Sequence, residues 1–322
     1  MELFIRLGEY IMARKRIIYQ SQSVKINGAV AMGVQSCSYG LDVSREDVMQ
    51  FGDLGAVDRV IMEAPTANME VNMYVGGLTP AVLSGCVELA IAGTAFTVQV
   101  GLDATEGSDY TGSNSAVTLT SGLMTSLSAE ASVGSIPTLT MGFEGTDLNY
   151  AAATIGAPNT NINVATQSGV IVGIGGLASS FKNHFLHPQS CNVSFDLGSE
   201  SLSELNLTAD KPTNPYLYAK VPSYPGTASM EIENFATDAG MSMTLSGLSQ
   251  KAGAAAAGDA NAGGKCNVNV VMGSTKFALI NATLDSVSFS NSVGDTAATC
   301  NANFGVSIGG PSSSSRIEVG SG

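Results

Sequence analysis

The run Gln35-Ser36-Cys37-Ser38-Tyr39-Gly40-Leu41-Asp42-Val43 has a second version later in the chain, Gln189-Ser190-Cys191-Asn192-Val193-Ser194-Phe195-Asp196-Leu197. After the shared Gln-Ser-Cys, both runs alternate polar and apolar residues, a period of two that is typical of a β-strand with one buried face. The two cysteines are 154 positions apart, close to half of the 322 residues. The sequence therefore predicts that one β-rich unit occurs twice.

Two further matches follow in the same order. The segment Thr66-Ala67-Asn68-Met69-Glu70-Val71 returns 161 residues later as Thr227-Ala228-Ser229-Met230-Glu231-Ile232. The segment Ser126-Leu127-Ser128, with Ser132-Val133-Gly134 behind it, returns 160 residues later as Ser286-Val287-Ser288 with Ser292-Val293-Gly294. Small changes of offset are what loop insertions and deletions produce. We expect a mainly β protein with two tandem homologous β-sandwich or barrel domains, each containing about one short helix.

The expected domain boundaries follow from these matches. They are an N-terminal arm over 1–17, copy one over 18–145, a connector over 146–180, copy two over 181–308 and a flexible tail over 309–322. Within the connector, one or two strands are expected, at 161–164 and 169–172. An Ala/Gly-rich tract at 252–264 predicts a mobile loop in copy two.

Local signals place turns and helices within copy one. Asn27-Gly28 predicts a tight hairpin between two strands. Thr79-Pro80 predicts a helix start, with Gly85 as its expected end and β-type sequence from Val87 onward. The corresponding helix of copy two is expected near Thr237. Strands are also expected over 116–119 and 123–132, and a long loop or extended hairpin over 45–58.

Charge is scarce and unevenly distributed. Charged residues make up 13% of the chain, about half of the usual share, and the net charge is −13. No Lys or Arg lies between Arg59 and Lys182, a stretch that carries these nine carboxylates: Glu63, Glu70, Glu88, Asp103, Glu106, Asp109, Glu130, Glu144 and Asp147. They either keep the surface soluble or form a face from which polyanions are repelled. Nucleic-acid binding by phosphate neutralisation is disfavoured, because it requires clustered Lys and Arg.

The sequence proposes no catalytic, cofactor or metal site. The five cysteines are widely spaced without a C-x-x-C pair, so buried free thiols are expected. His184 and His187 are the only histidines, and with Cys191 they do not complete a zinc ligand set. No serine elbow, phosphate loop or H-E-x-x-H is present. The N-terminal residues do not predict a signal peptide, and no apolar stretch is long enough to predict membrane insertion.

Two passages resemble bacteriophage tail tube proteins. The first runs from Gly33 to Val48 and includes Arg45-Glu46-Asp47, followed by Phe51-Gly52. The second is the serine-rich strand and Gly turn of 123–134, with its copy at 284–294. Copy two departs from the family pattern, because Gly198-Ser199-Glu200-Ser201 stands where copy one has Ser44-Arg45-Glu46-Asp47.

The resemblance implies a structural protein without enzymatic activity. Proteins of this family form rings of six β domains that stack into a hollow tube, through which genomic double-stranded DNA passes without specific binding. With two domains fused, three chains would complete such a ring. The implied partners are the chain itself and other tail proteins, such as baseplate, terminator or sheath. The implied location is the tail of the virion, after synthesis in the host cytoplasm.

The resemblance also assigns two groups of residues. The proposed contact between stacked rings uses these loop residues: Arg45, Glu46, Asp47, Phe51 and Asp53. The proposed acidic lumen uses Glu130, Glu144, Glu88 and Asp103. The alternative function is a capsid decoration or adhesin-like double β-sandwich, which predicts a stable monomer. A glycan hydrolase on a double β scaffold would need carboxylate pairs and aromatic platforms, which are scarce.

Overall fold

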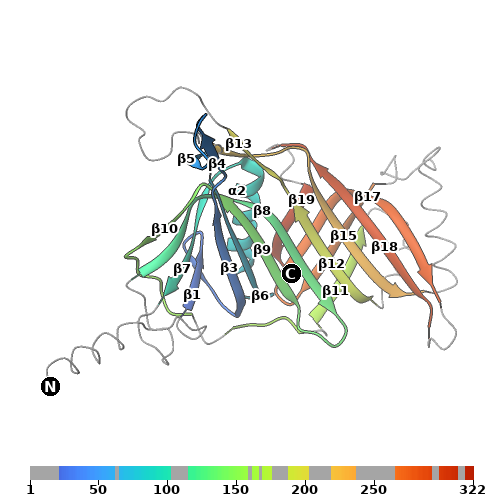
Figure 1. Cartoon of the computed structure of the whole chain (residues 1–322). Helices are drawn as coiled ribbons and strands as arrows, with labels where there is room; N and C mark the ends of the chain where they lie inside the picture. Colours follow the sequence, from blue (N-terminus) through green and yellow to red (C-terminus); the bar gives the residue numbers. More distant parts are fainter. Residues whose placement is uncertain are drawn as a thin grey trace, which may run out of the picture.

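The computed structural model describes residues 22–61, 65–102, 115–158, 162–166, 169–175, 188–202, 219–236, 265–291, 297–310 and 316–322. Strands dominate these residues, and they include one helix (Figure 1). The expected mainly β fold is confirmed. The expectations for residues 1–17, Asp103, the helix near Thr237 and the Ala/Gly tract at 252–264 lie outside the described residues.

The described part of the first half contains ten strands and the helix. Their bounds are β1 Gln22–Ile26, β2 Ala29–Ala31, β3 Val34–Asp42, β4 Arg45–Met49, β5 Ala56–Ile61, β6 Thr66–Tyr74, α2 Pro80–Ala92, β7 Phe96–Leu102, β8 Ser115–Ser132, β9 Thr138–Gly145 and β10 Asp147–Ala151.

The second half contributes nine described strands. They are β11 Val170–Gly175, β12 Pro188–Asp196, β13 Ser199–Leu202, β14 Ala219–Pro222, β15 Gly226–Phe235, β16 Lys265–Met272, β17 Thr275–Ser290, β18 Thr299–Ile308 and β19 Ile317–Ser321.

One antiparallel sheet runs through both halves. Its central part has the order β3-β6-β9-β8-β12-β15-β18-β17, from left to right in Figure 1. The first halves of the two longest strands, β8 and β17, extend beyond this eight-strand run and pair with further strands. There β8 pairs with β7 and β10, and β17 pairs with β16 and β19. The hairpins β4–β5 and β13–β14 form separate two-stranded sheets.

The strand pairing of the first half is repeated residue by residue in the second. Tyr39 of β3 lies opposite Met69 of β6, and Val193 of β12 lies opposite Met230 of β15. Those two offsets, 154 and 161, are the offsets of the sequence repeat. Interruptions of register repeat as well, at Gln35 and at Gln189. Below, residues or strands that occupy the same place in the two pairing patterns are called counterparts.

Every described strand of the second half has a counterpart. The pairs are β1 and β11, β3 and β12, β4 and β13, β5 and β14, β6 and β15, β7 and β16, β8 and β17, β9 and β18, and β10 and β19. The repeat in the sequence is therefore a repeat of topology. The division into two domains remains a prediction, because the sheet and its hydrophobic core pass from one half into the other.

The expected hairpin at Asn27-Gly28 is confirmed. Both residues have positive φ, 46° and 84°, and they join β1 to β2 in antiparallel register. Two consecutive residues with positive φ give the tight turn whose twist matches that of the flanking strands, and Asn-Gly tolerates this conformation best.

The helix begins where expected but is longer. Thr79 is the N-cap and Pro80 the first helical residue, yet the helix passes Gly85 and ends at Gly93, whose φ of 67° is left-handed. The β-type interpretation of Val87–Ala92 was therefore wrong. Leu83, Cys86, Val87, Ala90 and Ile91 are buried against the sheet. Burial of this face outweighs the lower helix propensity of β-branched residues.

Two further local expectations are corrected. The separate strands expected at 116–119 and 123–132 are one strand, β8, which bends at Ser121 (φ 54°). Its counterpart β17 bends at Asn281 (φ 57°). No strand occurs over 162–164, the described part of the segment expected at 161–164, whereas β11 confirms the strand expected near 169–172.

Candidate assembly interfaces

The two halves are joined by pairing between β8 and β12. In this joint Ala129 lies opposite Val193 and Leu127 opposite Phe195, and all four side chains are buried. On the other face of the sheet, Ser128 Oγ donates a hydrogen bond to Asn192 Oδ1 at 3.1 Å. The joint thus combines backbone pairing, an apolar layer and a polar layer.

The counterparts of these two strands lie at the ends of the eight-strand run. The counterpart of β8 is β17, and the counterpart of β12 is β3. Among the described residues, β3 pairs only with β6, and residues 286–290 of β17 pair only with β18. Each strand therefore presents one row of backbone N–H and C=O groups without a strand partner, which is the usual template for pairing with another chain.

Side-chain exposure at the edge of β3 differs sharply from that of its counterpart. Tyr39 is 39% exposed and Leu41 44%, whereas their counterparts Val193 and Phe195 are 0% and 1% exposed. On β17, Val287 and Phe289 are partly exposed, but their counterparts Leu127 and Ala129 are buried. Both free edges therefore carry partly exposed apolar side chains at positions whose counterparts are buried in the β8–β12 joint.

The same asymmetry appears on β10. In the second half, α2 packs against β19, and Val319 is 6% exposed. Its counterpart on β10 is Tyr150, which is 67% exposed. The aromatic ring of Tyr150 is thus exposed on the first half, whereas the corresponding position on the second half is covered by α2.

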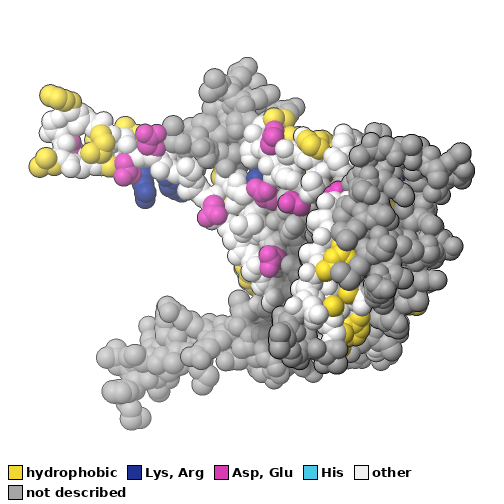
Figure 2. All heavy atoms as spheres, turned by 90° about the vertical axis from the view of Figure 1, so that its right-hand side faces the viewer, with side chains coloured by type: hydrophobic (Ala, Val, Ile, Leu, Met, Phe, Trp, Pro, Cys, Tyr) yellow, Lys and Arg dark blue, Asp and Glu magenta, His cyan; other side chains and the backbone are white. Residues whose placement is uncertain are grey.

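The segment expected to be a long loop or an extended hairpin is the hairpin β4–β5, which stands out from the body as an arm with hydrophobic side chains at its tip (Figure 2). Phe51 and Leu54 are fully exposed. Arg45, Glu46, Asp47 and Asp53, the other residues predicted for ring contacts, are all exposed on the same hairpin. Arg59 Nε forms an ion pair with Asp47 Oδ1 at 2.8 Å.

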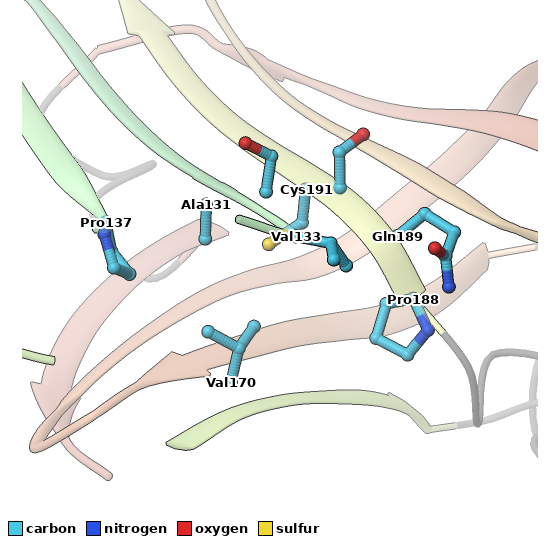
Figure 3. Close-up of a pocket in the computed structure, with 9 residues that line it drawn as sticks. Ala131, Val133, Pro137, Val170, Pro188, Gln189 and Cys191 are labelled. Atoms are coloured by element: carbon cyan, nitrogen blue, oxygen red, sulfur yellow. The ribbon is translucent and has the colours of Figure 1, made fainter. Parts of the chain in front are cut away.

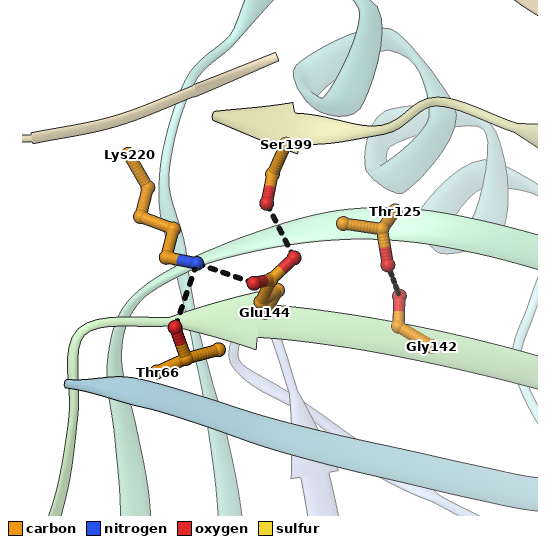
Figure 4. Close-up of polar contacts among 6 residues, drawn as sticks. All are labelled: Thr66, Thr125, Gly142, Glu144, Ser199 and Lys220. Atoms are coloured by element: carbon orange, nitrogen blue, oxygen red, sulfur yellow. Dashed lines mark hydrogen bonds and ion pairs between the residues drawn. The ribbon is translucent and has the colours of Figure 1, made fainter. Parts of the chain in front are cut away.

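The counterpart hairpin, β13–β14, is seated on the first half of the chain (Figure 4). Lys220 donates to the Glu144 carboxylate and to Thr66 Oγ1, the latter at 3.4 Å, and Ser199 Oγ donates to the same carboxylate. Only 4% of the Lys220 side chain is exposed. Tyr224, just after β14, donates to the backbone oxygen of Ile91 near the end of α2.

One face of the eight-strand run is polar. The apolar side chains of these strands alternate with small polar residues, among them Asn68, Ser128, Ser194, Ser229 and Asn301. The carboxylates on this polar face are Asp42, Glu70, Glu130, Glu144, Asp196, Glu231 and Glu233, together with Asp285 in β17. The only basic residue within these eight strands is Lys276, in the first half of β17 next to α2. Figure 2 shows acidic side chains spread over the body of the molecule among mostly uncharged side chains.

The structure does not bring the predicted lumen residues together. Glu130 is exposed on the polar face, and Glu144 lies on the same face but beneath the β13–β14 hairpin, paired with Lys220. Glu88 is on the exposed side of α2, which packs on the opposite face of the sheet, and its carboxylate accepts a hydrogen bond from Ser84.

Five carboxylates of the polar face outside β17 were not predicted from the sequence as lumen residues: Asp42, Glu70, Asp196, Glu231 and Glu233. Each of them alternates with apolar residues in a strand that lacks Lys and Arg, and this pattern was the signal that could have found them.

A small cavity of about 50 Å³ lies at one end of the β8–β12 joint (Figure 3). Ala131, Val133, Pro137, Val170 and Cys191 line it, and a volume of this size holds one or two water molecules at most. It therefore belongs to the packing of the joint and not to a ligand site.

All five cysteines are free thiols, with Cys37 partly exposed and the other four buried. Burial raises the pKa of Cys37 to about 12 and the pKa values of Cys86 and Cys191 to about 11. These thiols are therefore protonated and chemically inert at neutral pH.

Within the described part of the chain, no three His, Cys, Asp or Glu residues are grouped so that they could hold a metal ion. The helix found there is too short to cross a bilayer. No protein-family model matches the chain, and no curated protein matches it.

Proposed function

We propose that this protein is the subunit of a phage tail tube, in which three chains close into a ring and the rings stack into a hollow conduit for DNA. One observation carries the proposal: among the described residues, the two ends of the eight-strand run repeat the two edges of the β8–β12 joint, each without a strand partner. Residues 286–290 of β17 offer the edge that β8 offers, and β3 offers the edge that β12 offers.

Pairing of β17 with β3 of the next chain would be a head-to-tail contact. Such heterologous contacts build rings or filaments, because every added subunit presents the same free edge again. The register follows from the joint inside the chain, where Val193 lies opposite Ala129. Tyr39 is therefore expected opposite Phe289 of its neighbour, and Leu41 opposite Val287. The contact would cover the apolar side chains that are open in the single chain.

The polar face supports the conduit. In a closed ring the eight strands of each chain would form one continuous barrel, and its polar face would line the channel. A surface of Ser, Asn and Thr with carboxylates repels DNA phosphates and offers no site at which they could be neutralised. Closure at three chains rests on the resemblance to tail tube proteins. The exposed tip of β4–β5, with Phe51 and Leu54, remains the proposed contact with the next ring.

The proposal is tested by negative-stain electron microscopy and light scattering of the purified chain over a concentration series. Rings or tubes, with a smallest species of three times 32.8 kDa, are expected. A monomer at all concentrations, also when tube fragments are added as seeds, would contradict the proposal and favour the decoration or adhesin alternative.

Engineered disulfides test the register. In a Cys37→Ser background, Tyr39→Cys with Phe289→Cys is expected to form interchain disulfides on oxidation. The matched control, Tyr39→Cys with Val287→Cys, places the thiols on a diagonal about 7–8 Å apart, too far for a disulfide. Within one chain, positions 39 and 289 are separated by seven strand spacings, about 34 Å, so a bond between them must join two chains.

A further inference from the structure

We infer that the β4–β5 hairpin of one chain seats in a cavity on the second half of its neighbour, where Arg59 and Arg45 bind the carboxylate of Asp285. The inference rests on the proposed ring, and it names the surface that would lock one chain to the next. It changes the role of part of the predicted inter-ring loop: the base of the hairpin acts within the ring, while its tip stays free for stacking.

The seat of β13–β14 on the first half is the template. In that seat the β9 residue Glu144 receives Lys220 and Ser199. The offsets of the neighbouring strands, 154 and 161, assign Ser199 to Arg45 and Lys220 to Arg59. The pairing of the two hairpins agrees, because Ser199 lies opposite Pro222 as Arg45 lies opposite Ile61. The two donors of the internal seat are thus replaced by two arginines on the free hairpin.

The acceptor also has a counterpart. Glu144 corresponds to Gly305, because Asn68 lies opposite Glu144 and Ser229 lies opposite Gly305. Gly305 has no side chain, and a Cβ at that position would overlap the carboxylate of Asp285. Asp285 stands at the interruption of register in β17, where Thr125 stands in β8. Its carboxylate therefore lies over the residue that corresponds to Glu144.

An open cavity of about 500 Å³ surrounds this carboxylate. It is lined by Thr227, the counterpart of the Thr66 that binds Lys220, and by Asp285, Gly305, Lys265 and Arg316. Thr283 Oγ1 donates to Asp285 at 2.7 Å, and Arg316 Nη1 donates to the Ser307 oxygen at 3.0 Å. The corresponding place on the first half is filled by β13–β14. Among the described residues, the cavity therefore lies at the place that corresponds to the seat of β13–β14.

Charge is complementary between the hairpin and this seat. The hairpin carries Arg45, Glu46, Asp47, Asp53, Asp58 and Arg59, a net charge of −2, and the seat carries Lys265, Asp285 and Arg316, a net charge of +1. Besides the contact of the arginines with Asp285, the hairpin carboxylates thus have Lys265 and Arg316 as partners. Opposite charges of this kind fix the register of a contact and exclude wrong partners.

Zero-length carbodiimide cross-linking tests the contact, since it joins an amine only to a carboxylate in direct contact with it. The substitution Arg59→Lys gives the hairpin the amine that Lys220 has in the internal seat. We expect a cross-link between the new amine at position 59 and Asp285, seen by mass spectrometry between isotope-labelled and unlabelled chains. The Lys220–Glu144 cross-link within each chain is the positive control, and Asp285→Asn in the same background should abolish the interchain product.

A charge swap gives a second readout. Asp285→Arg is expected to raise the protein concentration required for half-assembly at least tenfold, and adding Arg59→Asp with Arg45→Asp should recover most of that loss. Disulfides between positions 39 and 289 without the cross-link between positions 59 and 285 would overturn the seat and leave the ring intact. Absence of both interchain products would overturn the ring and the seat together.

Discussion

Lys220 and Glu144 form an ion pair that ties the second half of the chain to the first, across 76 residues of sequence. The ammonium group is nearly inaccessible to water, while the carboxylate keeps partial exposure. Removing one member of such a pair leaves the other charge poorly solvated, which costs more than the loss of an exposed pair.

We therefore expect Lys220→Met to lower the free energy of unfolding by about 3 kcal/mol, measured by urea denaturation at a concentration where the chain is monomeric. Lys265→Met, at an exposed position, is the matched control and should change stability by less than about 0.5 kcal/mol. Equal effects of the two substitutions would show that the ion pair contributes nothing.

The edge of β3 gives a second prediction. Tyr39→Lys places a charge where the counterpart Val193 is wholly buried, so an assembled joint would have to bury an ammonium group. The concentration for half-assembly should rise at least about tenfold, since each 1.4 kcal/mol is a factor of ten. Light scattering measures it, and circular dichroism should show that the fold is kept.

Ser38→Lys is the control for this edge, because it puts the same charge on the same strand but on the polar face. Its effect on assembly should be much smaller. If both variants assemble like the parent, β3 is not the edge that pairs.

The buried thiols predict a loss of stability in alkali. In the unfolded chain a cysteine ionises near its ordinary pKa of 9.0, but burial raises the pKa values of Cys86 and Cys191 to about 11 in the folded chain. Between these values the unfolded state binds fewer protons, so stability falls as pH rises. The expected slope is about 1.4 kcal/mol per pH unit for each thiol.

Urea denaturation between pH 8 and pH 11 checks this prediction. Cys86→Ala should remove about half of the slope assigned to the two thiols, although it also lowers stability at every pH by leaving a small void. A slope that Cys86→Ala leaves unchanged would show that other groups cause the alkaline loss.

Charge reversal on the polar face tests the channel. Glu130→Lys with Glu231→Lys would place two cations on the face proposed to line the lumen, and assembled tubes should then retain double-stranded DNA in a salt-dependent manner. Glu88→Lys makes the same change on the exposed side of α2 and should leave DNA passage unaffected. Normal DNA ejection through the doubly reversed tubes would show that these carboxylates do not face the channel.

The repeat itself was predictable from the sequence, because strand registers are set by alternation and the matched segments carry it. Asn27-Gly28 and Thr79-Pro80 were readable because turn and cap chemistry is local. The end of α2 was not, since Gly85 is tolerated inside a helix whose burial is decided by distant strands. The bend of β8 falls at Ser121, next to Gly122, and a Ser-Gly step alone does not distinguish a bend within one strand from a break between two.

The candidate assembly surfaces could not be predicted from the sequence in the same way. The partner of Glu144 is Lys220, and only the topology reveals that β14 returns to the end of β9. Likewise, the alternation in the sequence predicts that Tyr39 and Leu41 are ordinary inward-facing residues of a strand. Their exposure becomes visible only by comparison with Val193 and Phe195, which have the same pattern but possess a neighbour.

The β8–β12 joint has a kinetic consequence for a ring built this way. Because a covalent tether holds its two strands together, this joint forms at an effective concentration in the millimolar range, independent of how much protein is present. A ring of six units would then contain three joints between molecules instead of six. Dilution, salt or mutation would break the joints between chains and leave the β8–β12 joints within chains intact. A ring that comes apart should therefore release whole chains, each with its internal joint still formed.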